Sequence, residues 1–204
     1  VGEQLPSRRR WAPKQRVPST IIDIRGCTRK VLIEGDPRGG TILKSAPGLR
    51  FGSFDPITGD RFDPPPVPRV FSKRNYANSP YYAMIHLDLN REVVVRNLEL
   101  DGASASMIRG GRYGDTGIQI PGSGIILSRN HDVKVSNIKT HHHPLDGIIV
   151  RWPRLREGEP RHPQLLDNIH STYNGRQGFS LTGSNSITIR RSVFAYKGKG
   201  EYAC

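Results

Sequence analysis

The chain lacks most of the features that stabilise small secreted domains or anchor a protein in a membrane. Its 204 residues include only two cysteines, Cys27 and Cys204, which lie far apart and offer neither a disulfide framework nor a CxxC motif. No stretch approaches the roughly 18 consecutive apolar residues that a membrane-spanning helix requires. No charged-then-apolar signal sequence stands at the start. The sequence therefore predicts no membrane span and no disulfide scaffold.

Acidic residues are scarce. Asp and Glu number 18 against 31 Lys and Arg, which gives a formal net charge of +13. A charge of this size favours a polyanionic partner such as an acidic polysaccharide. Part of it lies in residues 1–18, a basic, proline-punctuated segment that we expect to be an N-terminal arm or the remnant of a cap. Nucleic acid is the less favoured partner, because the chain lacks the interleaved aromatic and basic residues of single-strand binders.

Helical periodicity is also missing, and short strand-like runs take its place. Three of them begin with a glycine and read GIIL from Gly124, GIIV from Gly147 and GFSL from Gly178. Further strand-like runs lie between them, bounded by polar residues. Self-similarity with a period of roughly 20–30 residues indicates a solenoid. Because the repeating unit consists of strands, the sequence predicts an all-β fold, a β-helix in which each coil stacks on the next.

The repeat pattern predicts one β-helix domain over residues 19–204. Three segments break its rhythm and are interpreted as projecting loops: 55–82, 102–122 and 152–163. The first contains the run DPPPVP, which cannot form an interior strand because proline donates no ladder hydrogen bond. Cys204 falls in the middle of a repeat, so we expect the domain to be truncated at its C-terminal end.

Asparagines recur near the ends of the expected strands, at Asn90, Asn97, Asn130, Asn137, Asn168 and Asn185. Asparagine tolerates the left-handed backbone of a sharp corner. Side chains of this type can also hydrogen-bond to one another from coil to coil. We therefore predict a structural role for them in the corners, rather than a catalytic one.

Two segments carry a resemblance to a known family. The runs DVKVSNIKTHHHPLDGIIV from Asp132 and NGRQGFSLTGSNSITIRRSVF from Asn174 resemble the repeat of the pectate-lyase-like superfamily. The part NGRQGFSLTGS is similar to a segment of its bacterial and phage members, and the resemblance covers roughly residues 19–204. It implies a right-handed parallel β-helix. The superfamily includes polysaccharide lyases, glycoside hydrolases, uronate epimerases, tailspikes and adhesins, so the resemblance alone does not select an activity.

Aligning the coils on their glycines places the residues before each strand side by side. Asp146 then falls beside Gln177, and His143 beside Asn174, because adjacent parallel strands lie about 4.8 Å apart. In polygalacturonase-type hydrolases the catalytic carboxylates occupy this level, and Asp146 matches the first of them. An inverting hydrolase needs a second carboxylate. The next coil has Arg176 and Gln177 there instead, so hydrolysis is the less favoured chemistry.

Lyase or epimerase chemistry asks for a group that neutralises a uronate carboxylate and groups that move a proton. We predict that Arg176 pairs with the carboxylate, that His143 or Tyr173 moves the proton, and that Asp146 orients the sugar or the base. The predicted substrate-binding residues are Arg151, Gln177, Trp152, Tyr113 and Lys199. The structural alternative makes Asp146 a turn aspartate and Arg176 a residue that bridges carboxylates along the stack.

The run His141–His143 is interpreted as a turn and not as a metal site. Successive side chains point apart, and no carboxylate partner is evident at ligand spacing. We therefore predict no metal site and no firmly implied cofactor, with Ca²⁺ as the one cation left open.

These observations favour an extracellular or cell-surface enzyme that acts on acidic, uronate-containing polysaccharide by lyase- or epimerase-like chemistry. The alternative is a non-catalytic β-helix that serves as an adhesin, a tailspike or a glycan-binding module, with trimers expected for a tailspike. A polygalacturonase-like hydrolase is the second alternative.

Overall fold

The computed structural model describes residues 20–52, 58–61, 81–110, 122–152 and 156–198. Within these ranges the chain is all β, with one short 3-10 turn, η1 (Ser104–Ser106), and no α-helix. None of the described residues therefore forms a helix long and apolar enough to cross a membrane. The expected arm, residues 1–18, lies outside the described part of the chain.

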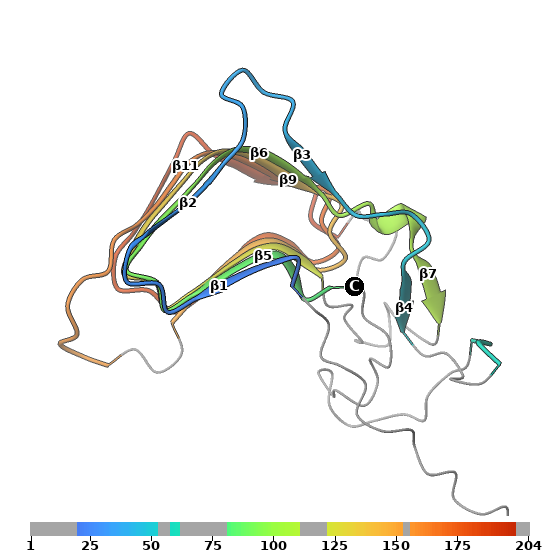
Figure 1. Cartoon of the computed structure of the whole chain (residues 1–204), viewed down its shortest axis with the longest axis horizontal. Helices are drawn as coiled ribbons and strands as arrows, with labels where there is room; N and C mark the ends of the chain where they lie inside the picture. Colours follow the sequence, from blue (N-terminus) through green and yellow to red (C-terminus); the bar gives the residue numbers. More distant parts are fainter. Residues whose placement is uncertain (1–19, 53–57, 62–80, 111–121, 153–155, 199–204) are drawn as a thin grey trace, which may run out of the picture.

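Two parallel sheets face each other (Figure 1). The first has the order β1 (Ile22–Arg25), β5 (Ala83–Asp88), β8 (Ser123–Ser128), β10 (Asp146–Arg151) and β12 (Gln177–Thr182). The second has the order β2 (Lys30–Glu34), β6 (Glu92–Asp101), β9 (Asp132–His141), β11 (Gln164–Thr172) and β13 (Ile187–Arg190). Two short strands extend the second sheet: β3 (Ile42–Lys44) beside β6, and β14 (Val193–Ala195) beside β11.

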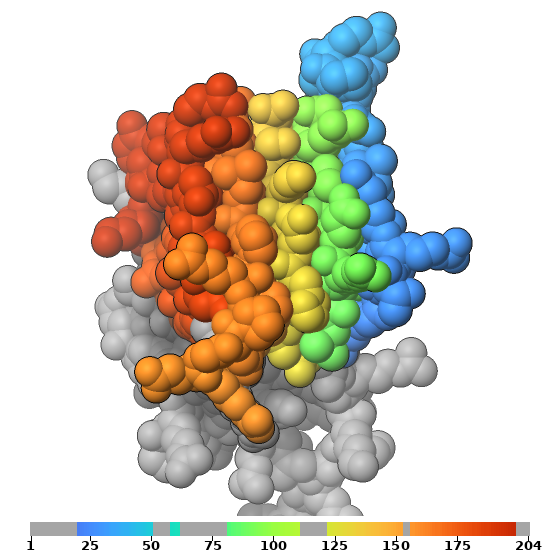
Figure 2. Space-filling model, turned by 90° about the vertical axis from the view of Figure 1, so that its left-hand side faces the viewer, coloured from blue at the N-terminus to red at the C-terminus, as the bar shows by residue number. Residues whose placement is uncertain are grey.

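The chain alternates between the two sheets, and the strand order is the same in both. One strand of the first sheet and the following strands of the second therefore form a layer, which stacks on the layer before it. Figure 2 shows these layers as adjacent bands that run from blue to red along the sequence. The expected repeat of strands is thus present as layers of parallel strands.

The expected loops are only partly described. Most of 55–82 lies outside the described residues. Within the second expected loop, 102–122, the described residues include a short strand: β7 (Ile108–Gly110) pairs in parallel with β4 (Arg50–Gly52) to form a third, two-stranded sheet. The amide of Ile108 donates to the carbonyl of Leu49 at 3.0 Å, which extends this pairing. Residues 156–163 contain no strand, as expected for the third loop.

The hydrophobic core lies between the two sheets. It is built from alternating residues of each strand, because successive side chains of a strand point to opposite faces. The first sheet contributes pairs such as Ile125 and Leu127, and the second contributes pairs such as Val133 and Val135, all almost completely buried. These branched side chains repeat in register from layer to layer and form continuous rows inside the stack.

Close packing between the sheets explains the glycine that opens the repeated strands. A Cβ atom on Gly124 would lie 2.4 Å from Thr140 Oγ1, and one on Gly147 would lie 1.9 Å from Ser171 Oγ. Both distances are far shorter than van der Waals contact. The second sheet's buried hydroxyls occupy the space that a side chain would need, so glycine is required at this point of the layer.

Stacked asparagines connect the layers at one buried corner. Asn90 Nδ2 donates to Asn130 Oδ1 at 3.0 Å, and Asn130 Nδ2 donates to the carbonyl of Leu87 at 2.8 Å. The Asn130 oxygen also accepts the backbone amide of Asn90 at 3.0 Å. Both side chains are buried, so each hydrogen bond satisfies a polar group that has no access to water.

A second, exposed ladder joins the strands of the second sheet at their bend. Asn137 Nδ2 donates to Asn97 Oδ1 at 2.9 Å, and Asn168 Nδ2 donates to Asn137 Oδ1 at 3.0 Å. All three have positive φ angles between 52° and 58°. The prediction of asparagine corners is confirmed at these positions. Asn185 differs, because it binds the backbone of His162 and Pro160 rather than another asparagine.

Candidate functional site

The predicted alignment at the start of β10 and β12 is confirmed. Asp146 pairs in register with Gln177. The amide of His143 donates to Asn174 Oδ1 at 3.1 Å, as expected for neighbours in adjacent layers. The glycine alignment therefore gave the correct register between these two layers.

Asp146 is completely buried, and its carboxylate is fully engaged within the protein. Arg176 Nε donates to Oδ1 at 2.8 Å, and the terminal nitrogen of Arg176 reaches Oδ2. Ser180 Oγ donates to Oδ2 at 2.8 Å, and the Gln177 amide donates to Oδ1 at 3.2 Å. Arg176 thus pairs with Asp146 where we had predicted that it would pair with a substrate. This geometry supports the structural alternative for both residues.

His143 lies inside the stack. It is completely buried, with Nε2 at 2.9 Å from Thr140 Oγ1 and Nδ1 at 3.5 Å from the Tyr81 hydroxyl. Burial lowers the pKa of His143 to about 3, and the charge of the neighbouring His141 acts in the same direction. The ring is neutral and held between core residues, so it cannot reach a polymer on the surface. Our assignment of His143 as a proton carrier conflicts with this burial.

Tyr173 is part of an aromatic stack. The residue is 39% exposed, and its ring stacks between those of His142, at 5.5 Å, and Tyr196, at 4.6 Å. Trp152 stacks on His162 at 4.2 Å. Two of the five predicted substrate-binding residues, Tyr113 and Lys199, lie outside the described residues.

A different group of polar side chains gathers on the outer face of the first sheet, which we call the charged face. It consists of Asp23, Arg25, Tyr82, His86, Asp88, Ser128, Arg129 and Arg151. Strand pairing creates it, because Asp23 is in register with His86, and Arg25 with Asp88. The row continues from Asp88 to Ser128 and Arg151. Of these residues, sequence reasoning had selected Arg151 alone.

His86 occupies the centre of the charged face. Its side chain is only 4% exposed, and Nδ1 lies 3.3 Å from Asp23 Oδ1. A hydrogen bond from Arg25 lowers the pKa of Asp23, so this carboxylate is charged. Burial lowers the pKa of His86, so its ring is neutral at physiological pH. With Nδ1–H directed to Asp23, the Nε2 lone pair has no hydrogen-bond partner among the described residues.

Two arginines lie near His86. Arg25 is bound to Asp23 by two hydrogen bonds of 2.8 and 2.7 Å, and its terminal nitrogen is 3.5 Å from His86 Nδ1. Arg151 donates to Ser128 Oγ at 2.9 Å and to the Tyr82 hydroxyl at 2.8 Å. The Tyr82 ring meets the His86 ring edge to face, 6.0 Å apart.

One signal in the sequence could have revealed the charged face. In both IDIR and AMIHLD, polar residues alternate with apolar ones at the end of an otherwise apolar strand. Period-two alternation indicates a strand with one polar face. The register between these strands was not predictable from the glycines, because neither strand begins with one.

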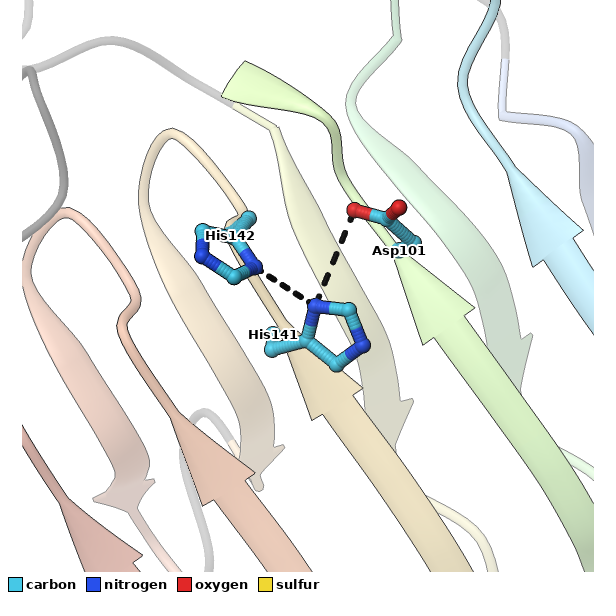
Figure 3. Close-up of side chains that lie close together, drawn as sticks. All are labelled: Asp101, His141 and His142. Carbon is cyan, nitrogen blue, oxygen red and sulfur yellow. Dashed lines mark hydrogen bonds and ion pairs between the residues drawn. The ribbon is translucent and has the colours of Figure 1, made fainter. Parts of the chain in front are cut away.

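The histidine run also differs from its expectation. Asp101, at the end of β6, is in register with His141, and Asp101 Oδ1 lies 3.7 Å from His141 Nδ1. The prediction that no carboxylate stands near these histidines is therefore wrong. Among the described residues, Asp101, His141 and His142 are the one group of three or more ligating side chains close enough to hold a metal ion (Figure 3). Two of its three ligands are imidazoles, which do not suit Ca²⁺.

Comparison of the chain with protein-family models, curated proteins and solved structures finds no match.

Proposed function

We propose that the chain forms a right-handed parallel β-helix and acts on uronate-containing polysaccharide at the charged face, by lyase- or epimerase-like proton transfer. Stacked layers of parallel strands and asparagine ladders between them support the β-helix. The resemblance noted in the sequence supports the same fold. The net charge of +13 favours an acidic polymer as the substrate.

The observation that carries this proposal is the environment of His86. A neutral imidazole is oriented by a carboxylate, and its second nitrogen has no hydrogen-bond partner in the part of the chain that the structure describes. This arrangement suits a general base. Arginine pairs with carboxylates in a planar, two-point geometry. Arg25 lies 3.5 Å from His86 Nδ1, and Arg151 binds the hydroxyl of Tyr82, whose ring contacts that of His86. A uronate carboxylate held by these groups would place the adjacent carbon-bound proton near His86.

An elimination also needs an acid that gives a proton to the leaving oxygen, and we assign this role to Tyr82. His86 Nε2 takes the proton from the carbon beside the carboxylate, the bond to the leaving oxygen breaks, and a carbon–carbon double bond forms. Tyr82 gives its hydroxyl proton to the leaving oxygen. Because His86 is buried, substrate binding must displace Tyr82 from its hydrogen bond with Arg151. In an epimerase the proton returns to the opposite face of the same carbon.

A non-catalytic role in glycan binding has its own support. Asp23 pairs with Arg25, and Asp88 pairs with Arg129, so part of the charged face is already neutralised within the protein. Elsewhere, the rings of Tyr173 and Tyr196 are 39% and 53% exposed and stack on each other. Both faces of the Tyr173 ring are covered, by His142 and by Tyr196, so a sugar would meet the exposed edges of this stack or the Tyr196 ring. In either role, an extracellular or cell-surface location is part of the proposal.

The test is incubation with pectate, alginate, hyaluronan and neutral glycans, with ultraviolet absorbance and reducing ends followed together. A lyase raises both signals on an acidic polymer, and His86→Gln should lower turnover by about 10²–10⁴-fold. His131→Gln, at an exposed position outside the charged face, is the matched control. Unchanged turnover in His86→Gln would disprove the assignment. Binding without turnover would favour the glycan-binding role, and reducing ends without absorbance would indicate a hydrolase.

A further inference from the structure

The three side chains of the possible metal site come from two neighbouring strands of the second sheet. Asp101 ends β6, His141 ends β9 in the next layer, and His142 follows directly. Parallel register brings Asp101 and His141 side by side although they are 40 positions apart in the chain. One ligand atom from each of the three lies within 4.8 Å of the others.

His141 stands at the centre of the group, as Figure 3 shows. Its Nδ1 is 2.6 Å from His142 Nδ1 and 3.7 Å from Asp101 Oδ1. Its other nitrogen, Nε2, is 3.0 Å from Glu99 Oε1. The Glu99 carboxylate accepts a hydrogen bond from Nε2–H, which leaves the lone pair on Nδ1, directed toward Asp101 and His142. Metal-binding histidines in proteins are commonly oriented in this way by a carboxylate behind the ring.

A left-handed residue makes it possible for two consecutive histidines to meet. His142 has a φ of 52°, so its side chain does not point away from that of His141 as it would in an extended strand. Tyr173 and Tyr196, at φ values of 52°, adopt the same conformation in later layers. The His142 ring lies flat against the Tyr173 ring, with 5° between their planes, which holds it in position.

The charge around the group is balanced before any ion binds. Lys44 Nζ is 2.9 Å from Asp101 Oδ2, and Lys139 Nζ is 3.1 Å from Glu99 Oε2. The Ala103 amide also donates to Asp101 Oδ1 at 2.9 Å. The ion pair with Lys44 and this hydrogen bond both suit a carboxylate, the form of the side chain that binds a metal ion.

The two ring nitrogens that face each other are His141 Nδ1 and His142 Nδ1. The Nδ1–Nδ1 distance of 2.6 Å is shorter than an ordinary hydrogen bond to nitrogen. Without an ion, two lone pairs could not face each other at this distance unless one nitrogen held a proton between them. A metal ion would take the place of that proton and accept both lone pairs.

We propose that Asp101, His141 and His142 bind one divalent transition-metal ion of the zinc type. Two imidazole nitrogens and one carboxylate oxygen form the set that suits Zn²⁺. In a tetrahedral site with bonds of about 2.0–2.1 Å, ligand atoms stand about 3.3 Å apart, and the distances of 2.6 and 3.7 Å here lie on either side of that value. His142 is exposed, so the fourth position is open to water. The site is independent of the function proposed for the charged face.

The test is a calorimetric titration of the full chain with ZnCl₂. The chain is first freed of metal with a chelator, and a weak competing chelator is present during the titration. Replacing Zn²⁺ with Co²⁺ adds a visible absorption band that reports tetrahedral coordination. We expect one ion per chain. His142→Asn keeps a residue that tolerates the left-handed backbone, and Asp101→Asn keeps the acceptor for the Ala103 amide. Each should weaken binding by at least tenfold.

Two further variants make the result specific. Glu99→Gln removes the carboxylate behind His141 but no ligand, and it should weaken binding by about 10–100-fold. His131→Asn, at an exposed histidine that contacts Trp152 and His162, should leave the affinity unchanged. The proposal is overturned if the wild-type chain binds no Zn²⁺. It is equally overturned if His142→Asn and Asp101→Asn bind as tightly as the wild type, since the ion would then be held elsewhere.

Discussion

The guanidinium of Arg176 forms an ion pair with the carboxylate of Asp146 in the preceding layer, with Nε at 2.8 Å from Oδ1. Asp146 is completely buried, while Arg176 keeps 27% of its side chain exposed. Two residues that the sequence suggested as parts of an active site are therefore joined to each other. Their pairing neutralises a buried negative charge between layers, which is a structural task.

Removing the positive partner should destabilise the fold. Arg176→Met leaves the buried Asp146 carboxylate without its counter-charge, and breaking a buried pair in this way costs about 3–5 kcal/mol. Arg190→Met is the matched control, because Arg190 is 58% exposed and its partner Asp167 is also held by Arg191. The control should cost about 1 kcal/mol or less. Urea unfolding measures both, and equal effects would contradict the structural role.

The buried asparagine ladder should contribute more to the free energy of unfolding than the exposed ladder does. Asn130→Ala removes the acceptor of the Asn90 backbone amide and the donor to the Leu87 carbonyl in a buried corner, and it leaves the Asn90 side-chain amide with its bond to Ile24 alone. An unsatisfied buried polar group costs about 1–3 kcal/mol, so a loss of about 3 kcal/mol or more is expected. Asn137→Gly, in the exposed ladder, permits the same positive φ and should cost about 1 kcal/mol or less. A larger loss at Asn137 in denaturant melts would refute this ranking.

The substitution Gly147→Ala should disturb the packing between the sheets. A Cβ on Gly147 would meet Ser171 Oγ at 1.9 Å and Asn174 Nδ2 at 2.8 Å. Overpacking of this kind costs about 1–3 kcal/mol. Ser171→Ala removes the nearest atom, so the double variant should lose less than the sum of the two single variants. Strict additivity in thermal unfolding would show that the contact with Ser171 is not the cause.

Lowering the pH should reduce the free energy of unfolding, because histidines whose pKa values are lowered in the folded chain gain protons on unfolding. The pKa of His143 is lowered to about 3 in the folded chain, mainly by burial, against about 6.5 in the unfolded chain. Between these values the unfolded state binds a proton that the folded state does not. The free energy of unfolding therefore falls as the pH falls below about 6.5, by up to about 1.4 kcal/mol per pH unit for this residue.

This pH dependence can be isolated above about pH 5, where carboxylates are charged in both the folded and the unfolded state. His143→Gln should flatten the slope of unfolding free energy against pH between 5 and 6.5, and His131→Gln should not. His86 and His142, whose pKa values are also lowered, leave a residual slope of the same sign. An unchanged slope in His143→Gln would mean that this ring titrates normally in the folded chain.

The sequence by itself determined the local elements and the spacing of the layers. Glycines before apolar runs marked strands that have no room for a side chain at their second residue, as Gly124 and Gly147 show. Asparagines marked corners, because their short amide side chains accept a left-handed backbone, as at Asn97, Asn137 and Asn168, and hydrogen-bond from layer to layer. These features depend on local backbone geometry and on the spacing of similar segments along the chain. Both can be recognised from the order of the residues.

Only the tertiary structure decided which polar groups meet. Asp101 and His141 are neighbours because β6 and β9 pair in one particular register, and a shift of one residue would separate them. The same holds for Asp23 and His86 across β1 and β5. The burial of His143 and the pairing of Asp146 with Arg176 depend in turn on how layers pack in three dimensions. Charge, burial and free lone pairs are properties of that packing, so they could not be read from the order of residues alone.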